Sequence, residues 1–456
     1  MNTQLAHNSF YSNDKQEDKL KLAYKKNRLF DHLVSKKESV AVIGLGYVGL
    51  PLALHMGSKF KVVGFDVNES KVLQLMQHKD PCKELKPKDF KKKDIKFSFN
   101  DNLLNNCKFF IVAVPTPIDK YKMPQLEPLK SATAMVAKHL KKGDCVVFES
   151  TVFPGCTEEI CVPILERISR LKFNIDFTVG YSPERINPGD KEHTFTKIKK
   201  IVSGSNQDAL KLISDVYASV VEAGIHQAES LKVAEAAKVV ENIQRDVNIG
   251  LMNELSQIFQ TLNIETKDVL KAAGTKWNFH NYFPGLVGGH CIGVDPYYLI
   301  ERAKKFNIRP KLLETVRKTN EGMVDFIVNS IKSKLWIKNL NKKASILVKG
   351  ITFKEDVNDI RNSKMTEIIK KLKREGFDVT VEDPNACAME VKEYYGIELT
   401  EDVNCNSLFD VIVMGVNHKQ YNNIDSLTQS LTRFGFLFDI RGTFKHLALQ
   451  NRYYTL

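Results

Sequence analysis

A chain of 456 residues is too long for one ordinary hydrophobic core, so we expect two or three domains. Hydrophobic residues make up 43% of the chain and charged residues 27%, which is typical of globular proteins and excludes a disordered or fibrous class. No apolar run approaches the ~20 residues of a membrane-spanning helix, and residues 1–14 are polar, so we expect a cytoplasmic protein without membrane insertion.

The net charge of +13 makes nucleic acid a partner to consider. The lysines, however, alternate with acidic residues along the whole chain, and the densest run, residues 91–93, is short. Solvated lysine-rich faces explain this pattern better, so we predict no nucleic-acid partner. The eight cysteines form no C-x-x-C pair and no zinc spacing, which predicts reduced thiols and no metal site.

Residues 1–37 form a basic polar extension with weak helical periodicity. From Glu38 onward, short apolar segments alternate with amphipathic ones up to residue 228. Strands separated by helices predict a parallel, doubly wound sheet. The expected strands are residues 40–43, 61–65, 109–114, 145–149, 177–180 and 200–203.

A dinucleotide-binding pattern follows the first strand. Gly44-x-Gly46-x-x-Gly49 opens a helix, and Asp66 ends the next strand. The three glycines allow a tight turn, close approach of a pyrophosphate and close helix packing, and the helix N-terminus offers N–H groups to the phosphates. A carboxylate at Asp66 suits a ribose and repels a 2′-phosphate, so NAD is favoured over NADP, although a glycine turn without a ligand is the alternative. We expect NAD to contact Gly44, Gly46, Tyr47, Val48, Gly49 and Asp66.

Three further polar residues follow the third and fourth of these strands. Thr116 and Thr151 either donate to phosphate or ribose or are ordinary turn hydroxyls, and the sequence leaves both interpretations open. Glu158 follows near the expected nicotinamide end and is a candidate base or water-positioning group. Its neighbour Glu159 would serve equally well by spacing.

Around Glu229 the strand pattern stops and a central domain, residues 229–330, begins. A long helix is predicted there, because apolar residues recur in steps of three and four at 240, 243, 247, 251, 255, 258 and 262. Such a helix carries an oligomer interface or lies in the core, and we expect a homodimer or higher oligomer. Lys238 and Asn242 share one face of it, where they stabilise an oxyanion or are simply solvated.

The central domain also holds the loop Gly288-Gly289-His290-Cys291. Cys291 is a candidate nucleophile behind two glycines that give a substrate access, with Asp295 four residues on. A small buried cysteine is the alternative. From residue 331 a second, smaller strand-helix domain is expected, with residues 321–343 as its bridge. Its predicted strands are 344–350, 378–381, 410–416 and 435–439, and its predicted helix, 363–375, is ended by Gly376.

The fold class is therefore α/β, with two Rossmann-like doubly wound parallel-sheet domains joined by a central long helix. Over residues 38–445 the chain resembles the UDP-glucose/GDP-mannose dehydrogenase family of nucleotide-sugar 6-dehydrogenases. The motifs that carry the resemblance are residues 44–51, 181–185, 234–242, 288–296, 352–354 with 359–361, and 439–441. Residues 181–190 and 276–279 are similar to bacterial enzymes that act on UDP-N-acetylglucosamine or UDP-N-acetylgalactosamine.

The resemblance implies NAD-dependent four-electron oxidation of C6 of a UDP-N-acetylhexosamine to a uronic acid, for capsule or O-antigen polysaccharide. It also implies a thiohemiacetal and then a thioester on Cys291, an oxyanion held by Lys238 and Asn242, proton transfer by Asp295 and a hydrolytic water at Glu158. The remaining implied contacts are Lys354, Arg441, Gly288 and Gly289 with the UDP-sugar and Arg361 with NAD.

Two positions depart from the family pattern. Ile118 replaces a threonine of the UDP-glucose enzymes, and Phe283 replaces an arginine of some relatives. UDP-glucose and UDP-N-acetylmannosamine are the alternative substrates. More remote alternatives are a β-hydroxyacid dehydrogenase, which would form one NADH per substrate rather than two, and a non-enzymatic NAD-binding or nucleic-acid-binding protein.

Overall fold

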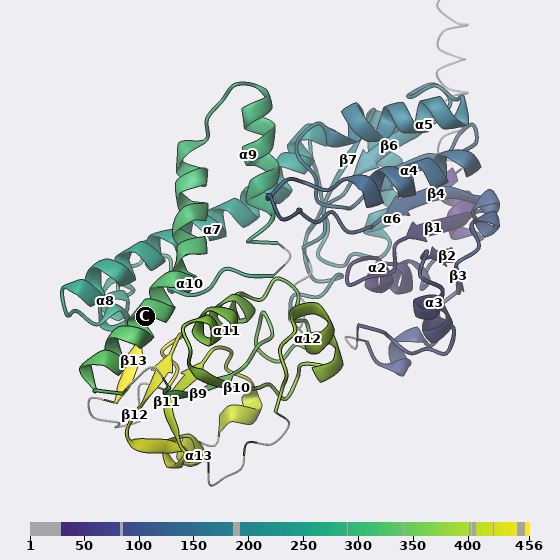
Figure 1. Cartoon of the computed structure of the whole chain (residues 1–456). Helices are drawn as coiled ribbons and strands as arrows, with labels where there is room; N and C mark the ends of the chain where they lie inside the picture. Colours follow the sequence, from purple (N-terminus) through teal and green to yellow (C-terminus); the bar gives the residue numbers. More distant parts are fainter. Residues whose placement is uncertain are drawn as a thin grey trace, which may run out of the picture. The chain divides into compact units, whose positions relative to one another are not determined.

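The computed structural model describes residues 29–82, 85–185, 192–289, 291–340, 343–400, 403, 407–422, 424–444 and 452–456. The chain divides into two compact units, Met1–Val240 and Glu241–Leu456, each with its own sheet (Figure 1). The division falls inside the long helix α7, Leu231–Thr261. Most of the predicted extension, part of the 181–190 motif and His290 lie outside the described residues.

Strands and helices alternate along the first unit, as its apolar pattern predicts. The strands are β1 Ser39–Ile43, β2 Lys61–Phe65, β3 Ile95–Ser98, β4 Cys107–Val112, β5 Cys145–Phe148, β6 Thr178–Tyr181, β7 Lys200–Gly204 and β8 Ile225–Gln227. The helices are α2 Gly49–Met56, α3 Glu69–Met76, α4 Glu127–His139, α5 Val162–Ser169 and α6 Gln207–Ala218, with short turns η1 Pro87–Phe90, η2 Asp101–Asn106 and η3 Thr157–Cys161. The short strands β3 and β8 escaped the sequence analysis.

The described strands of this sheet lie in the order β3-β2-β1-β4-β5-β6-β7-β8. Since β1 pairs in parallel with both β2 and β4, the topological switch point lies beside β1, where the Gly44 turn follows. The prediction of a parallel sheet fails for one pair, because β7 runs antiparallel to β6. The described residues between these two strands contain no helix, so the chain reverses there instead of crossing over.

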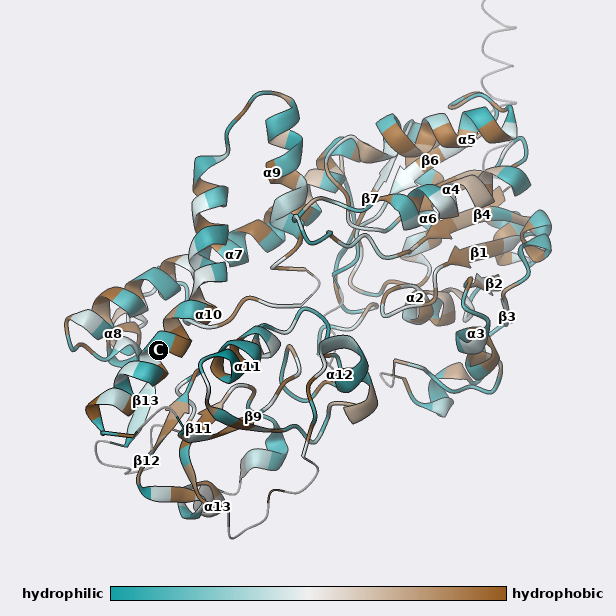
Figure 2. Ribbon diagram, in the orientation of Figure 1, coloured by the Kyte–Doolittle hydropathy of each residue, from teal (hydrophilic) through white to brown (hydrophobic). Residues whose placement is uncertain are grey.

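The core of the first unit lies on both faces of this sheet. Helices α2, α3 and α6 share one buried cluster with alternate strand residues such as Phe109 and Ile111. Figure 2 shows that β1 and β4 consist mainly of hydrophobic residues. The intervening Phe110 is equally buried, and α4 packs on β4. Leu33 is completely buried in the same cluster as Phe109, so the end of the predicted extension belongs to this core.

Helix α7 begins at Leu231, well before the first apolar residue of the predicted stripe. Four residues of that stripe are exposed rather than buried, namely Val240, Leu251, Ile258 and Leu262. Three further helices follow α7: α8 Thr266–Ala273, α9 Asp295–Lys305 and α10 Lys311–Ile337.

The second sheet is parallel throughout its described strands, in the order β10-β9-β11-β12-β13. These strands are β9 Ser345–Lys349, β10 Asp378–Glu382, β11 Phe409–Met414, β12 Leu431–Asp439 and β13 Tyr453–Thr455, the last of which was not predicted. The helices are α11 Lys364–Arg374, α12 Ala388–Tyr395 and α13 Ile424–Gln429, with the turn η4 Lys419–Asn422.

The core of the second unit places α10 and α11 on one face of its sheet. Ile327 and Ile331 of α10 share a buried cluster with Ile346 of β9, so the expected bridge, residues 321–343, is largely a core helix. The opposite face packs against Tyr421 and a few neighbours.

The predicted fold class is confirmed. Within the described residues, none of the helices combines the length and apolarity needed to span a bilayer, and no cluster of metal-ligating side chains occurs.

Candidate active site

The glycine turn after β1 has the geometry that a pyrophosphate requires. Gly44 has φ +91°, and a Cβ on Gly49 would lie 1.8 Å from the Gly44 carbonyl oxygen, so neither position accepts a side chain. A Cβ on Gly46 would meet no atom within 4 Å. Helix α2 starts there with no capping side chain at Val48 and no acid in its first turn. An open approach to uncapped N–H groups suits a dinucleotide phosphate.

Asp66 lies beside this turn, at the carboxyl end of β2. Its Oδ2 accepts a hydrogen bond from the Leu45 N–H and forms an ion pair with Lys71 Nζ, both at 2.9 Å. Its Oδ1 accepts a hydrogen bond from the Asn68 N–H at 3.0 Å. These contacts fix the carboxylate while leaving acceptor capacity, since two oxygens offer about four lone pairs. The ribose contact of Asp66 stays a prediction that this geometry permits.

The two threonines at the ends of β4 and β5 hold the strand-end loops together. The Thr116 hydroxyl donates to the Thr151 carbonyl oxygen at 2.7 Å, and the Ser150 hydroxyl donates to the Val114 carbonyl oxygen at 2.7 Å. The turn interpretation of Thr116 is therefore favoured, because its proton is already engaged.

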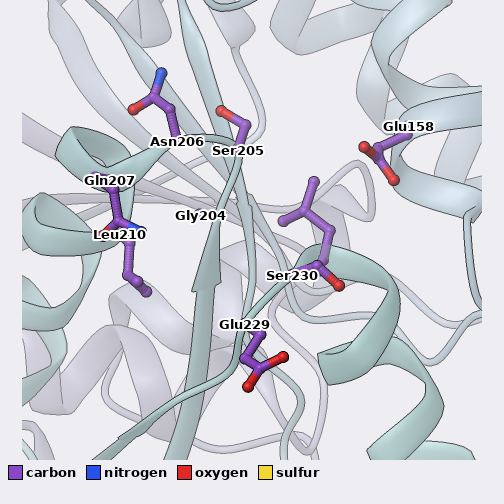
Figure 3. Close-up of a pocket in the computed structure, with 9 residues that line it drawn as sticks. Glu158, Gly204, Ser205, Asn206, Gln207, Leu210, Glu229 and Ser230 are labelled. Atoms are coloured by element: carbon purple, nitrogen blue, oxygen red, sulfur yellow. The ribbon is translucent and has the colours of Figure 1, made fainter.

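Glu158 lies on η3 and lines a pocket of about 370 Å³ (Figure 3). Its side chain is 42% exposed, and Lys232 Nζ lies 3.9 Å from its carboxylate. The other lining residues follow β7 and β8 and include no other predicted site residue: Gly204, Ser205, Asn206, Gln207, Leu210, Glu229, Ser230 and Leu231. Lys238, the other predicted catalytic residue of the first unit, is not among the residues that line this pocket.

Glu235, which spacing did not single out, fixes the backbone in front of Glu158. Its carboxylate is completely buried and accepts the Gly155 N–H at 2.5 Å, the Thr157 N–H at 2.9 Å and the Thr157 hydroxyl at 2.7 Å. Burial raises the pKa of Glu235, against these hydrogen bonds. The sequence signal that could have found this anchor is an acidic residue inside the 234–242 motif.

A second buried charge cluster joins β5, β6 and β7. Lys200 Nζ lies 2.6 Å from Glu184 and 3.1 Å from Glu149, and the Tyr217 hydroxyl donates to Glu149. Burial raises the pKa of Glu149, while Lys200 opposes that rise. Glu184 belongs to the 181–185 motif, so the sequence marks this member of the cluster. Its partner Lys200 lies in no motif and could not be recognised from the sequence.

Lys238 and Asn242 are both buried on α7, with 4% and 1% exposure. The alternative of a solvated lysine and a surface asparagine is therefore wrong. Asn242 donates through Nδ2 to the Asp295 carboxylate and accepts through Oδ1 from Arg245. Arg245 was not predicted, although it stands one helical turn after Asn242.

Cys291 is exposed on the turn that leads into α9. Its carbonyl oxygen accepts the Asp295 N–H at 2.8 Å, and Asp295 is itself 2% exposed. The second unit therefore brings Cys291, Asp295 and Asn242 together around one turn. By contrast, burial raises the pKa of Cys107 and Cys145 to about 12, which keeps those two thiols protonated and unreactive.

The glycine pair before Cys291 is required for packing, whereas its role in giving a substrate access stays a prediction. A Cβ on Gly288 would lie 2.8 Å from the Asn362 carbonyl oxygen, and one on Gly289 would lie 2.9 Å from the Phe353 ring. Gly289 also has φ +75° and donates its N–H to that same carbonyl at 3.3 Å. The cysteine loop is thus seated directly on the loop that follows β9.

That loop and the end of β12 carry the predicted substrate and cofactor contacts. Arg361 is held by Asp359, with Nε at 2.9 Å and Nη2 at 2.7 Å from its two oxygens, while 48% of the arginine side chain stays exposed. Arg441 pairs with Glu355 at 2.7 Å across the two loops. Lys354 directly precedes Glu355 in the chain and is partly exposed.

Comparison with known proteins identifies the family of this chain. The UDP-glucose/GDP-mannose dehydrogenase family matches with its NAD binding domain over residues 38–221, its central domain over 232–322 and its UDP binding domain over 347–446. The chain belongs to this family. It is accordingly an NAD-dependent oxidoreductase of the nucleotide-sugar dehydrogenases, and its UDP binding domain indicates a UDP-sugar substrate.

Several relatives in the family match over nearly their whole length. Protein CapL of Staphylococcus aureus is 48% identical over 89% of this chain and 96% of that protein. A UDP-N-acetyl-D-glucosamine 6-dehydrogenase of Pseudomonas aeruginosa is 47% identical over 85% and 92%. Among solved structures, a UDP-D-ManNAc dehydrogenase of Pyrococcus horikoshii has a TM-score of 0.83 at 28% identity, covering 91% of this chain and 98% of that one.

Proposed function

We propose that this enzyme oxidises C6 of UDP-N-acetylglucosamine to the uronic acid in two steps, through covalent capture on Cys291. The choice of substrate is supported by two relatives that are named UDP-N-acetyl-D-glucosamine 6-dehydrogenase, from Pseudomonas aeruginosa at 47% identity and from Salmonella typhi at 46% identity. UDP-N-acetylmannosamine dehydrogenases are more distant, at 31% identity for one from Methanocaldococcus jannaschii. A uronic acid of this kind would enter capsule or O-antigen polysaccharide, and the enzyme would work in the cytoplasm.

One observation carries the covalent route: an exposed thiol lies one turn from a buried carboxylate that Asn242 holds in place. The Cys291 sulfur attacks the C6 aldehyde, and the resulting thiohemiacetal keeps the intermediate from leaving. NAD⁺ held at the glycine turn beside Asp66 would supply the hydride acceptor for each of the two oxidations. Lys238 and Asn242 stabilise the oxyanion, and water releases the acid from the thioester and restores the thiol.

We assign the proton transfers of this cycle to Asp295. Its carboxylate is buried beside the Cys291 turn, so it is placed to take the thiol proton and later to activate water. Glu158 is the alternative for the water step. Glu158→Gln decides between them, because this variant keeps Asp295 and so still forms the acyl-enzyme. Accumulation of acyl-enzyme in intact mass spectra would assign water activation to Glu158, and its absence leaves that step with Asp295.

The experiment that tests the function is an NADH assay with four substrates: UDP-N-acetylglucosamine, UDP-N-acetylgalactosamine, UDP-N-acetylmannosamine and UDP-glucose. We expect the highest kcat/KM with UDP-N-acetylglucosamine and two NADH formed for each sugar consumed. A higher kcat/KM with any of the other three contradicts the substrate, and one NADH per sugar contradicts the four-electron route.

We further propose that the enzyme is a homodimer or higher homo-oligomer that pairs through α7. Val240, Leu251 and Ile258 of α7, and Leu262 directly after it, are between 46% and 59% exposed and recur at helical spacing, which suits a docking face. Sedimentation analysis tests the proposal. Leu251→Glu should dissociate the assembly while Lys271→Glu on α8 does not, and a monomeric wild-type enzyme overturns it.

A further inference from the structure

The second sheet has its own switch point between β9 and β11, because the chain continues from β9 to β10 on one side and to β11 on the other. Ligands of open parallel sheets bind outside the carboxyl ends of the strands at such a point. Three loops meet there, following β9, β10 and β11. The buried side chains that join these loops determine the loop conformation that a ligand at this site would contact.

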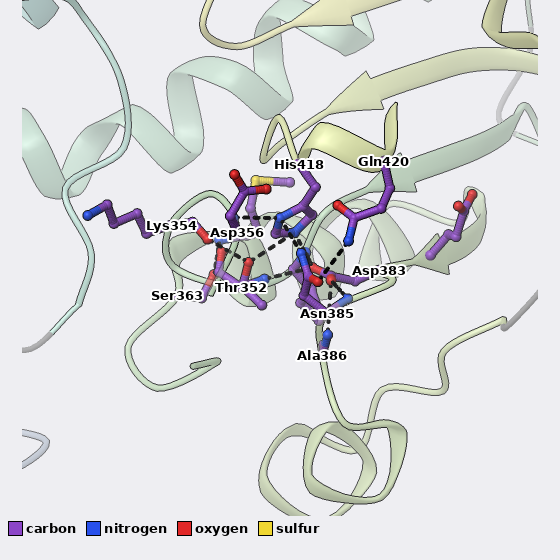
Figure 4. A network of polar contacts seen from close by, with 12 residues as sticks. Thr352, Lys354, Asp356, Ser363, Asp383, Asn385, Ala386, His418 and Gln420 are labelled. Carbon is purple, nitrogen blue, oxygen red and sulfur yellow. Dashed lines mark hydrogen bonds and ion pairs between the residues drawn. The ribbon is translucent and has the colours of Figure 1, made fainter. Parts of the chain in front are cut away.

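His418, after β11, stands at the centre of these contacts and is 1% exposed (Figure 4). Its Nδ1 accepts the Asp356 N–H at 3.0 Å and lies 2.8 Å from Asn385 Nδ2. Its Nε2 lies 3.1 Å from the Asp383 carboxylate and 3.2 Å from the Thr352 hydroxyl. The ring therefore bridges all three loops.

These partners select one tautomer of the imidazole. Both groups that face Nδ1 are donors, so Nδ1 carries no proton. On the other side Asp383 accepts, and the Thr352 hydroxyl gives its own proton to the Lys354 carbonyl oxygen at 3.0 Å, so Nε2 carries the proton. The neutral Nε2–H ring satisfies every partner, whereas the other tautomer would oppose donor to donor at Nδ1.

The loop fixed in this way is the one that follows β9. Phe353 N–H donates to the Asp359 carbonyl oxygen at 3.0 Å, and the Ser363 hydroxyl donates to the Thr352 carbonyl oxygen at 3.2 Å. Asp356 adopts φ +57°, a strained backbone conformation for a non-glycine residue that its bond to His418 helps to maintain. Figure 4 shows the Lys354 side chain reaching away from this cluster.

We propose that His418 is a positioning residue of the UDP site. As a neutral Nε2–H imidazole it sets the backbone of residues 352–356, and this backbone presents Lys354 to the nucleotide. His418 does not touch the ligand itself, because it is buried beneath the loop. The inference depends on the UDP site of the proposed function but not on the identity of the sugar.

The test measures UDP binding by titration calorimetry for two variants, each of which keeps a hydrogen-bonding group near only one of the two ring nitrogens. His418→Asn retains an acceptor near the place of Nδ1, and His418→Gln retains a donor near Nε2 but leaves the Asp356 N–H without an acceptor. We expect a Kd for UDP about tenfold weaker in the Gln variant and within about threefold of wild type in the Asn variant. The KM for the UDP-sugar should follow the Kd, with the KM for NAD unchanged.

Asp410→Ala is the control for lost stability alone. Asp410 accepts the Ser345 N–H at 3.0 Å and the Thr432 hydroxyl at 3.1 Å at the amino-terminal edge of the same sheet. This variant should bind UDP as wild type does while losing thermal stability. Wild-type UDP affinity in the Gln variant, or equal losses in the Gln, Asn and Asp410→Ala variants, overturns the proposal. If the Gln variant does not fold, His418→Ala replaces it, because it likewise leaves the Asp356 N–H without an acceptor, and unchanged UDP affinity there overturns the proposal too.

Discussion

The glycine turn of the first unit and the glycine pair of the second use the same residue for opposite purposes. Around Gly46 there is open space where a side chain would fit, and uncapped N–H groups face it. Around Gly288 and Gly289 the space is filled by Asn362 and Phe353. The open space at Gly46 leaves room for a ligand to approach, whereas the contacts at Gly288 and Gly289 show that packing requires a glycine there.

The polar groups of the two units differ in the same way. In the first unit the turn offers N–H groups toward a ligand, while in the second Asn242 and Asp295 hold each other next to Cys291. The first arrangement suits the binding of a phosphate, and the second fixes polar side chains beside the proposed nucleophile. Changes that remove one feature at a time test this difference.

The largest effect is expected from the catalytic turn. Asn242→Ala removes the donor that orients Asp295 and one proposed oxyanion contact, so kcat should fall by about 10²–10³. The matched control is Asn248→Ala on the same helix, whose side chain donates to the Gln244 carbonyl oxygen and should leave kcat within about threefold. Steady-state kinetics measure both, and similar kcat values for the two variants would refute the role of Asn242.

A pH effect on stability is expected at the edge of the first sheet opposite to the glycine turn. Burial raises the pKa of Asp144 from 3.8 to about 6, opposed by hydrogen bonds from Lys108 and Lys141. Because the folded pKa is the higher one, the protonated form is favoured on folding, and wild type loses stability as the pH rises from about 4 to 6. Relative to Asp144→Asn the loss is at most about 3 kcal/mol.

Denaturant unfolding of wild type and Asp144→Asn across this pH range measures the difference. The assignment would be contradicted if the difference in free energy of unfolding between the two proteins did not change with pH. It would also be contradicted if wild type gained stability relative to Asp144→Asn as the pH rises. NAD affinity should be the same in both proteins, since Asp144 lies at the start of β5, away from the turn.

Packing at the glycine pair predicts a smaller change. Gly288→Ala forces a Cβ against the backbone carbonyl of Asn362, so the free energy of unfolding should fall by about 2 kcal/mol. Gly293→Ala in the same loop is the control, because its Cβ would make only ordinary contact, 3.4 Å from the Val287 carbonyl oxygen. Equal stability of the two variants would show that the pair is not held by packing.

The smallest change tests the open turn. Gly46→Ala has room for its Cβ, so the melting temperature should not move, but the methyl group would occupy the approach of the pyrophosphate. We expect NAD to bind about tenfold more weakly, measured by calorimetry. Undiminished NAD affinity would mean that the cofactor does not approach Gly46.

The sequence predicted what periodicity and spacing encode. The G-x-G-x-x-G turn, the long helix and the strand-helix pattern of both sheets follow from local residue order. Strands β3, β8 and β13 escaped because they are short and mix polar with apolar residues, unlike the equally short but apolar β5. The antiparallel step at β7 escaped because strand direction depends on the connection and not on the strand's own residues.

At the site, the sequence found the groups that stand in motifs but not their partners. Asn242 and Asp295 were predicted separately, whereas their hydrogen bond joins residues far apart in the chain. Lys200 and His418 are buried polar residues whose neighbours come from other strands, so no local pattern marks them. The packing role of Gly288 likewise depends on a loop that follows β9.

The central claim is that the exposed Cys291 thiol captures the half-oxidised sugar. The most direct measurement is the amount of NADH formed per UDP-N-acetylglucosamine consumed, for wild type, Cys291→Ala and the control Cys387→Ala on the second unit. We predict two NADH and one uronate per sugar for wild type and the control, and no uronate for Cys291→Ala with its fold intact. Two NADH per sugar at the wild-type rate in Cys291→Ala would contradict the account.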